Sequence, residues 1–207
     1  MTARFITLEG GEGVGKTTNL DFIEHYLRSR GIDVLRTREP GGTPMGEGVR
    51  DLLLQSGTMD RWAELLLVFA ARAQHISEVI RPALAAGQWV LSDRFTDASH
   101  AYQGGGRGLD PVVIEQLETW VQQGLQPDLT LLLDAPVELG MARARRRGQT
   151  DRFEAERLEF FENVRAAYLA RAERFPERIR RVDASGSLAE VQARIALHLE
   201  ALLVSPP

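Results

Sequence analysis

Short apolar runs alternate along the chain with longer segments in which apolar residues recur every three or four positions. Continuous runs such as Leu131-Leu132-Leu133 are typical of strands buried on both faces of a sheet. The pattern predicts strands at Arg4–Leu8, Asp33–Thr37, Trp89–Ser92, Asp128–Asp134 and Ile179–Asp183. It predicts helices at Lys16–Arg30, Gly46–Gln55, Trp62–Ala86, Pro111–Gln123, Pro136–Arg147, Ala155–Arg174 and Leu188–Leu203. Regular alternation of strand and helix indicates an α/β fold, with a five-stranded parallel sheet and helices on both of its faces.

Composition and charge exclude several classes of protein. The 207 residues, of which 43% are hydrophobic and 26% charged, suit one globular domain spanning 1–207. The absence of cysteine excludes a disulfide framework and a thiolate metal site. Because the chain shows neither a signal-peptide pattern nor an apolar run of membrane-spanning length, we expect a cytoplasmic protein without a membrane partner. A net charge of −4 argues against a general nucleic-acid binder, which would usually be basic.

The most informative motif follows the first predicted strand. Residues 10–17 read Gly-Gly-Glu-Gly-Val-Gly-Lys-Thr and match the phosphate-loop pattern G-x-x-x-x-G-K-S/T, which requires a strand before it and a helix after it. Glycines let the backbone N–H groups approach phosphate oxygens, and the start of the helix adds its positive dipole end. Lys16, the only lysine in the chain, supplies a full charge, and the Thr17 hydroxyl is placed to hold Mg²⁺. The alternative is a glycine-rich turn that binds nothing, and the strand and helix on either side argue against it.

Polar clusters follow two other predicted strands. Ligands of parallel sheets bind beyond the carboxyl ends of the strands, so residues there are candidates for a site. After the third strand, Asp93 can hold Mg²⁺ and Arg94 can grip a phosphate, or the two can form a strand-end ion pair. After the second strand, we expect Arg38 and Glu39 to face the interior at the start of a Pro-Gly turn. The alternative there is a turn without a functional role.

A glycine-rich stretch lies beyond the third strand. The three glycines at 104–106 should preclude a stable helix, which leaves Tyr102 and Gln103 just before a flexible loop. Tyr102 offers an aromatic face and Gln103 an amide, both suited to a ligand. His100 is interpreted as a structural or solvated histidine, because phosphoryl transfer to a phosphate needs little general-base help.

Two further stretches allow a structural or a functional interpretation. Phe69 and Arg72 lie three residues apart on one predicted helix, where spacing alone favours a core role for Phe69 over the reading of a planar base. The arginine-rich segment 143–152 suits the end of a helix, because cations and Gly148 both favour helix termination. Against this interpretation, five arginines in ten residues beside a flexible stop suit a mobile flap that closes on phosphates.

Taken together, these residues resemble the bacterial thymidylate kinase family. The match runs in order over nearly the whole chain, and its specific motifs are Arg-Glu-Pro-Gly-Gly-Thr at 38–43 and Ala-Tyr-Gln-Gly at 101–104. The resemblance implies transfer of a phosphoryl group from ATP to dTMP to make dTDP, with Mg²⁺ as the cofactor. It also implies the fold of P-loop NTPases, a short arginine-rich lid at about 143–153, and a homodimer that packs along helices.

The resemblance further implies a role for each matching residue. ATP would be bound by Gly10, Gly11, Glu12, Gly13, Val14, Gly15, Lys16, Thr17, Thr18 and Arg143, and Mg²⁺ by Thr17 and Asp93. dTMP would be bound by Glu39, Pro40, Arg50, Phe69, Arg72, Arg94, Ser99, Tyr102 and Gln103. The catalytic set would be Glu12, Lys16, Asp93, Arg94 and Arg147. Arg94 would bridge the two phosphates, and Glu12 marks the subtype in which the catalytic arginine, Arg147, comes from the lid.

Within the dTMP site, the resemblance assigns Arg50 to the phosphate, Arg72 to a thymine carbonyl and Phe69 to stacking on the base. The last assignment reverses the interpretation from spacing alone. Tyr102 would crowd the 2′ position of the sugar and thereby disfavour ribonucleotides.

Two other activities remain open at this point. A kinase for a different nucleoside monophosphate would keep the loop and change the base pocket. A nucleotide-dependent ATPase without an acceptor would keep the loop and lack that pocket. A GTPase switch is excluded, because its Asn-Lys-x-Asp base reader requires a lysine and the only lysine is Lys16.

Overall fold

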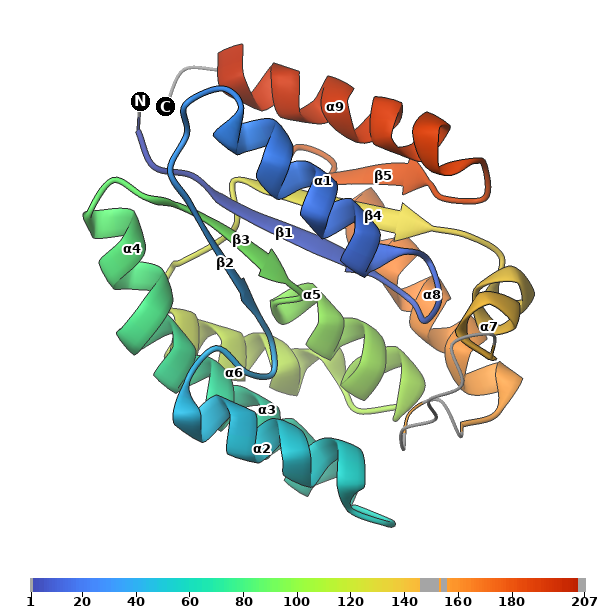
Figure 1. Ribbon diagram of the computed structural model, residues 1–207. Helices are drawn as coiled ribbons and strands as arrows, with labels where there is room; N and C mark the ends of the chain where they lie inside the picture. Colours follow the sequence, from blue (N-terminus) through green and yellow to red (C-terminus); the bar gives the residue numbers. More distant parts are fainter. Residues whose placement is uncertain (1, 146–152, 154–155, 205–207) are drawn as a thin grey trace.

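A five-stranded parallel sheet forms the centre of the computed structural model, which describes residues 2–145, 153 and 156–204 (Figure 1). In the described residues the strands are β1 (Phe5–Gly10), β2 (Val34–Arg38), β3 (Trp89–Asp93), β4 (Leu129–Asp134) and β5 (Ile179–Asp183). Their spatial order is β2-β3-β1-β4-β5, and each neighbouring pair is parallel. The predicted α/β fold is therefore confirmed. Because β1 lies in the middle, the loop that follows it opens at the centre of the carboxyl end of the sheet.

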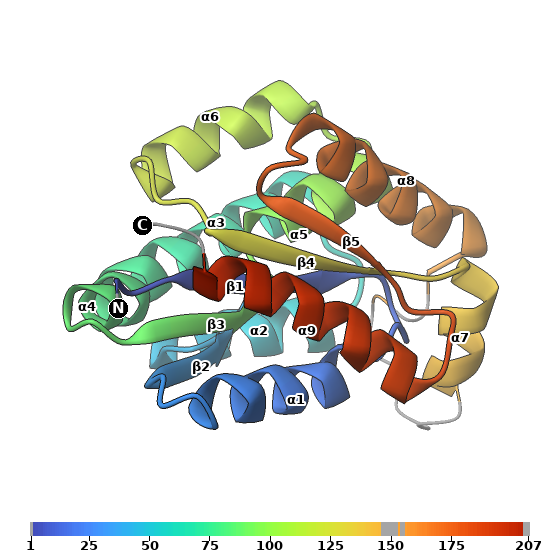
Figure 2. The same cartoon turned by 90° about the horizontal axis from the view of Figure 1, so that it is seen from above.

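Helices cover both faces of this sheet. Over the described residues they are α1 (Lys16–Arg28), α2 (Pro44–Gln55), α3 (Arg61–His75), η1 (Ile76–Ile80), α4 (Arg81–Ala85), α5 (Thr96–Ser99), η2 (His100–Gly106), α6 (Pro111–Gln122), α7 (Val137–Arg145), α8 (Leu158–Arg174) and α9 (Leu188–Val204). Figure 2 shows α1 and α9 on one face and α3, α5, α6 and α8 on the other. Among these helices none has the length and apolar character that a membrane span requires.

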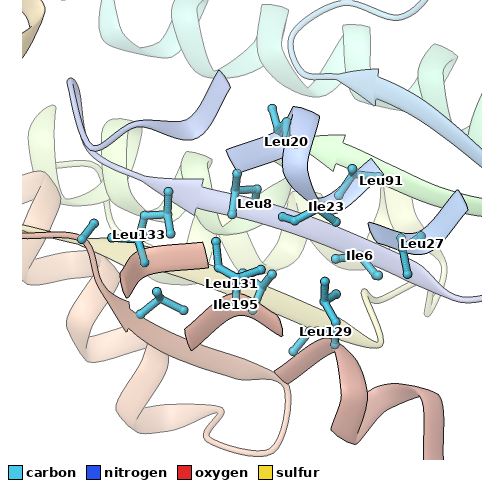
Figure 3. Close-up of a cluster of buried hydrophobic side chains, with 14 of the residues drawn as sticks. Ile6, Leu8, Leu20, Ile23, Leu27, Leu91, Leu129, Leu131, Leu133 and Ile195 are labelled. Atoms are coloured by element: carbon cyan, nitrogen blue, oxygen red, sulfur yellow. The ribbon is translucent and has the colours of Figure 1, made fainter. Parts of the chain in front are cut away.

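The largest hydrophobic cluster lies between the sheet and the pair α1 and α9 (Figure 3). Side chains of a strand alternate between faces, so every second residue of β1 and β4 points into this cluster. The apolar stripe predicted on α1 is buried there, as are the strand residues opposite it: Ile6, Leu8, Leu20, Ile23, Leu27, Leu129, Leu131 and Leu133. Burying one such side chain stabilises the fold by about 1.5–3 kcal/mol. The opposite face of the central strands buries polar groups instead, among them Thr7, Glu9 and Thr130.

Several predicted helices begin or end elsewhere. The segment predicted as one helix, Trp62–Ala86, contains the π-helix η1, in which the N–H of Arg81 donates to Ile76 five residues back. The next residue, Pro82, has no N–H and its ring crowds the preceding turn, which a wider π turn relieves. Helix α8 begins at Leu158 rather than at residue 155, because Arg157 is extended. Helix α2 begins earlier than predicted, at Pro44.

The prediction that three glycines preclude a helix at 104–106 is wrong, because the π-helix η2 runs through them. A Cβ atom on Gly105 would lie 2.6 Å from the carbonyl oxygen of Asn163, and one on Gly106 would lie 2.4 Å from the ring of Phe160. Only glycine lets η2 approach α8 this closely. Close packing between the two helices therefore outweighs the weak helix propensity of glycine.

Candidate functional site

The phosphate loop, residues 10–17, joins β1 to α1 and is shaped by its glycines. Gly10, Gly13 and Gly15 have φ values of 141°, 68° and 92°, a region that L side chains avoid. At Gly13 a Cβ atom would lie 1.8 Å from the carbonyl oxygen of Gly140, so the loop meets α7 backbone to backbone. Gly15 caps α1 without a side-chain hydrogen bond. The N–H groups of the first helical turn therefore remain open to an anion.

Lys16 folds back across this loop. Its Nζ donates hydrogen bonds to the carbonyl oxygens of Gly11 at 2.9 Å and Gly10 at 3.3 Å. Burial, together with the charge of Arg94, lowers the pKa of the Lys16 amine to about 8. A bound phosphate would favour the charged form and raise that pKa. The loop thus presents a cation whose charge is stabilised by the ligand it is shaped to bind.

Asp93 and Thr17 border one hollow at the start of α1, together with Arg38 and Arg50. Asp93 ends β3 beside β1, and its buried Oδ1 has no hydrogen-bond partner in the described part of the chain. A carboxylate and a hydroxyl are oxygen donors of the kind that Mg²⁺ prefers. The described residues contain no cluster of three or more His, Cys, Asp or Glu that could hold a metal. Mg²⁺ does not require such a cluster, because it usually keeps several water ligands and takes few protein ones.

A pocket opens beside the loop, and we call it the lateral pocket. Its lining comes from the loop, the turn after β2, α2, α3, the segment after β3, η2 and one residue that precedes α8. These residues are Glu12, Glu39, Pro40, Arg50, Leu53, Leu54, Val68, Arg72, Arg94, Phe95, Ala98, Ser99, Tyr102, Gln103 and Phe153. Eight of the nine residues predicted to bind dTMP line it, Phe69 being the exception. The pocket combines three arginines with apolar and aromatic walls, as a site for a small phosphorylated ligand requires.

Buried hydrogen bonds fix Arg72 in the wall of this pocket. Its Nε donates to Glu39 Oε2 at 2.7 Å and its Nη2 to the carbonyl oxygen of Phe95 at 3.1 Å. The other oxygen of Glu39 lies 2.9 Å from His75 Nδ1, and His75 Nε2 lies 2.7 Å from Thr37 Oγ1. Arg72 is only 1% exposed, and among the described residues its Nη1 finds no partner. The arrangement holds one N–H donor of the guanidinium ready for an acceptor on a ligand.

Arg94 is positioned by two phenols between the lateral pocket and the loop. Its backbone is left-handed, with a φ of 69°. Its Nη2 donates to the hydroxyl of Tyr102 at 2.8 Å, and its Nη1 to that of Tyr168 at 3.1 Å. Tyr168 in turn donates to Glu9 at 2.7 Å, and Glu9 also accepts the N–H of Phe95 at 2.7 Å. A guanidinium held this way can interact with two phosphates without first losing rotational freedom.

The thymidylate kinase family model matches residues 8–195 of the chain. The chain belongs to the thymidylate kinase family. It is 62% identical over 206 residues to the thymidylate kinase of Chromohalobacter salexigens, covering 98% of this chain and 97% of that one. It is 60% identical to the thymidylate kinase of Teredinibacter turnerae, covering 98% and 100% of the two chains. The crystal structure of the thymidylate kinase from Ehrlichia chaffeensis matches with a TM-score of 0.81 at 32% identity, covering 97% and 99%.

Membership of the thymidylate kinase family confirms the resemblance, the P-loop NTPase fold and the nature of the protein as an enzyme of this kind. The individual site residues stay predictions. Of these, Phe69 is 2% exposed and packs against Leu65, Leu109 and Ile114. The guanidinium of Arg72 lies 4.6 Å from its ring centroid. The structure therefore shows Phe69 behind Arg72, as the core interpretation predicts, and its stacking on a base stays a prediction.

Arg38 differs from the prediction, whereas Glu39 agrees with it. The Arg38 side chain is 52% exposed and its Nη2 donates to Glu47 of α2 at 2.7 Å. Glu39 is buried at 4% exposure. The two differ because β2 is the outermost strand, so that Arg38 at its end reaches across to α2 while the next residue turns under the lateral pocket. The prediction that both side chains face the interior is therefore wrong: Glu39 is buried in the wall of the lateral pocket, whereas Arg38 lies at the exposed rim of the hollow that Asp93 and Thr17 border. His100 agrees with its structural interpretation, since it is buried with Nε2 3.0 Å from Glu118.

Only part of the predicted lid falls within the described residues. Arg143 donates to the carbonyl oxygens of Ala184 at 2.9 Å and Ser185 at 3.5 Å, which places it beside the loop that follows β5. Phe153 lines the lateral pocket and meets Tyr102 edge-on, with ring centroids 5.8 Å apart. Arg147, the predicted catalytic arginine, lies outside the described residues.

Glu9 and Tyr168 lie at the site, although the sequence predicts no role for either. Burial and, to a smaller extent, the charge of Asp97 raise the pKa of Glu9 to about 8, against the opposing effects of Arg94 and of the hydrogen bonds. Glu9 is the residue before the loop glycines, yet its partner Tyr168 lies 159 positions away on α8. The hydrogen bonds of Tyr168 to Glu9 and to Arg94 therefore connect the start of the phosphate loop with Arg94. Tyr168 lies on α8, which no local sequence pattern links to the loop.

Proposed function

We propose that this thymidylate kinase family member transfers the γ-phosphoryl group of ATP to dTMP, giving dTDP and ADP. The fixed and unpaired Nη1 of Arg72 in the lateral pocket supports this function most directly. Thymine offers carbonyl oxygens to such a donor, and Arg50 in the same pocket supplies a cation for the dTMP phosphate. The phosphate loop beside the pocket supplies the donor site.

In the reaction, an oxygen of the dTMP phosphate attacks the γ-phosphorus of ATP in line. A new P–O bond forms, the bond from the γ-phosphorus to the β–γ bridging oxygen breaks, and the electron pair leaves with ADP. Lys16 and Arg94 neutralise the charge that spreads over the transferred group. The protein contributes position and charge rather than covalent chemistry.

Thr17 and Asp93 would hold Mg²⁺, and the unpartnered Oδ1 of Asp93 fits that role. When bound, Mg²⁺ supplies charge neutralisation at the β- and γ-phosphate oxygens. From the resemblance we infer that residues 1–207 act as one domain and that Arg147, with Glu12 in the loop, completes the catalytic set from the lid.

A homodimer completes the proposed assembly. Trp62 and Leu66 are four residues apart on α3 and share one face, with exposed fractions of 42% and 56%. Trp120 on the neighbouring α6 is 69% exposed. Exposed tryptophans on adjacent helices are typical of protein interfaces. Sedimentation should show a dimer, and Leu66→Glu should convert it to a monomer; a wild-type monomer would contradict the assembly.

A coupled ADP-release assay tests the function directly. ATP and Mg²⁺ are supplied with dTMP, dUMP, the ribose form of TMP, CMP or AMP in turn. We expect strong turnover with dTMP, weak turnover with dUMP and negligible turnover with the others. A preference for another monophosphate would keep the mechanism and discard the thymine assignment. ADP release without any acceptor would point to an ATPase instead.

A further inference from the structure

A buried acid lies behind the lateral pocket and has no part in the reaction as described so far. Glu64, in the first turn of α3, is fully buried. Its Oε1 accepts a hydrogen bond from Gln103 Nε2 at 2.8 Å. Arg107 Nε donates to both oxygens of the same carboxylate, at 3.1 and 3.3 Å. Arg107 is held in turn by Glu156 at 2.5 Å and by the ring of Phe160, 4.7 Å from the guanidinium carbon.

This contact decides which way the amide of Gln103 points. A carboxylate paired with a guanidinium only accepts hydrogen bonds, so the NH₂ group of the Gln103 amide must face Glu64. The amide oxygen is then the atom that Gln103 can offer to a ligand in the lateral pocket, which Gln103 lines. Without the carboxylate, a half-turn of the amide would present NH₂ to the pocket at little steric cost, because the two ends of an amide have nearly the same shape.

We propose that Glu64, held by Arg107, is a positioning residue that selects the oxygen of Gln103 to face the base, and thereby favours thymine over cytosine-type bases. This role rests on the proposed function. Thymine carries a hydrogen on ring atom N3, and this N–H can donate a hydrogen bond to an amide oxygen. Cytosine carries a lone pair on N3, which would face the lone pairs of that oxygen. A site built to hydrogen-bond a group strongly rejects an analogue that leaves its buried polar atoms unpaired.

A second group in the same pocket also favours thymine over cytosine. Arg72 Nη1 is a donor, and it suits the carbonyl oxygen at position 4 of thymine rather than the amino group of cytosine. A donor from Arg72 and an acceptor from Gln103 together match the adjacent acceptor and donor of a thymine edge. Two buried carboxylates thus set this pattern from behind, because Glu39 orients Arg72 and Glu64 orients Gln103.

Glu64→Gln tests this role in the full-length protein. It keeps the shape of the side chain but replaces a carboxylate, which only accepts hydrogen bonds, with an amide, which can also donate them. The substrates are dTMP and 5-methyl-dCMP, which share the sugar, the phosphate and the methyl group and differ at N3 and position 4. We expect kcat/KM for dTMP to fall at least about tenfold, mainly through KM, and the ratio of dTMP to 5-methyl-dCMP to fall by a similar factor.

The matched control is Glu118→Gln. Glu118 is also largely buried and paired with a histidine and an arginine, but it lies on α6 away from the lateral pocket. Its substitution should leave the substrate ratio within about twofold. A ratio that is unchanged in Glu64→Gln, or that changes equally in Glu118→Gln, would overturn the role of Glu64.

A double variant separates positioning from general support of the fold. If Glu64 acts through Gln103, adding Glu64→Gln to Gln103→Ala should change the substrate ratio by less than about threefold. An equally large effect in the presence and absence of Gln103 would overturn the proposed role. If Glu64→Gln fails to fold, the single variant Gln103→Ala carries the test, because Glu64 is proposed to act only through Gln103; an unchanged substrate ratio in that variant would overturn the role.

The wild-type data separate the two conclusions. A wild-type protein that turns over dTMP, combined with an unchanged ratio in the variants, overturns the positioning role alone. A wild-type protein without dTMP turnover overturns both the proposed function and this role.

Discussion

The phosphate loop and the lateral pocket lie side by side yet are built in opposite ways. The loop is one contiguous run, residues 10–17, and it works mainly through backbone N–H groups and glycine conformations. The pocket gathers side chains from the loop, strand ends and several helices, and buried charge pairs hold its reading groups in place. The difference teaches that a phosphate site can be built from the backbone conformation of one short segment. A site that recognises one base needs side chains from several elements, each held in a fixed orientation by a buried partner.

This comparison has a direct experimental consequence. A change in the loop should impair ATP use and spare dTMP binding, and a change behind the pocket should do the reverse. Variants that mix the two effects would show that the regions are energetically coupled.

Lys16→Ala should have the largest effect on the donor side. It removes the only cation contributed by the loop itself, and kcat should fall about 10³-fold, equivalent to about 4 kcal/mol of transition-state stabilisation. The dissociation constant for dTMP, measured by calorimetry, should stay within about threefold. Arg30→Ala, an exposed arginine near the end of α1, serves as the control and should keep near-normal turnover. Near-normal turnover of Lys16→Ala would remove Lys16 from the mechanism.

Gly13→Ala should break the loop itself. The added Cβ would enter a left-handed backbone position and lie 1.8 Å from the carbonyl oxygen of Gly140. We expect a loss of about 3 kcal/mol in the free energy of unfolding. Thermal denaturation should show this as a fall in Tm of about 6–12 °C. Gly11→Ala is the matched control, since a Cβ there meets nothing within 4 Å. Equal melting temperatures in the two variants would contradict the backbone contact.

Glu39→Gln should impair the pocket and spare the loop. It weakens the buried ion pair that orients Arg72, so KM for dTMP should rise about tenfold while KM for ATP changes less than about twofold. Steady-state kinetics with each substrate varied in turn measures both values. Glu24→Gln removes an acid that pairs with arginines on the surface of α1 and β2, and it should change neither KM. A rise in KM for ATP alone would contradict the separation of the two regions.

Glu9 should give an effect that is small at each step of pH, a pH dependence of stability. Its folded pKa of about 8 lies above the unfolded value of 4.5, so the folded state holds a proton that the unfolded state releases between these limits. The stability contributed by this proton is fully present below 4.5 and is lost as pH rises through about 8. The free energy of unfolding should therefore fall by about 1 kcal/mol per pH unit across this window.

Glu9→Gln keeps the shape of the protonated carboxyl and cannot titrate. Urea unfolding at pH values across the window should show a flatter slope for this variant than for the wild type. Parallel slopes would show that the Glu9 carboxyl is already ionised in the folded protein at neutral pH.

The sequence predicts the phosphate loop well because all of its parts are close together in the chain. It does not predict the hydrogen bonds behind the lateral pocket, because their partners are far apart in the chain. Strand, loop and helix occupy neighbouring positions in the chain, so one motif contains the loop conformation, its charge and the predicted metal ligand. The resemblance identifies most of the residues that line the pocket, among them Glu39, but not Glu64 and His75, which hold Gln103 and Glu39 in place. His75 follows Arg72 on a core face and looks like any buried histidine, and the contact of Glu64 with Gln103 spans 39 positions.

Helix η2 is a case in which local sequence predicts the wrong structure. Local propensity predicts a loop at 104–106, and it fails because the packing of Gly105 and Gly106 on α8 becomes visible only once both helices are placed. The prediction that Arg38 faces the interior fails for a related reason. Its position after a strand is evident in the sequence, but the sequence does not say that this strand forms the edge of the sheet.

Lys16 has a further consequence for the chemistry of the whole surface. It is the only side chain with a primary amine, and its pKa of about 8 leaves a nucleophilic fraction at neutral pH. Acylating reagents attack amines and leave the guanidinium groups of the 24 arginines intact. Acylation of side-chain amines in this protein is therefore confined to its phosphate loop, where a bound nucleotide would shield the amine. The residue proposed to bind phosphates would at the same time report whether they are bound.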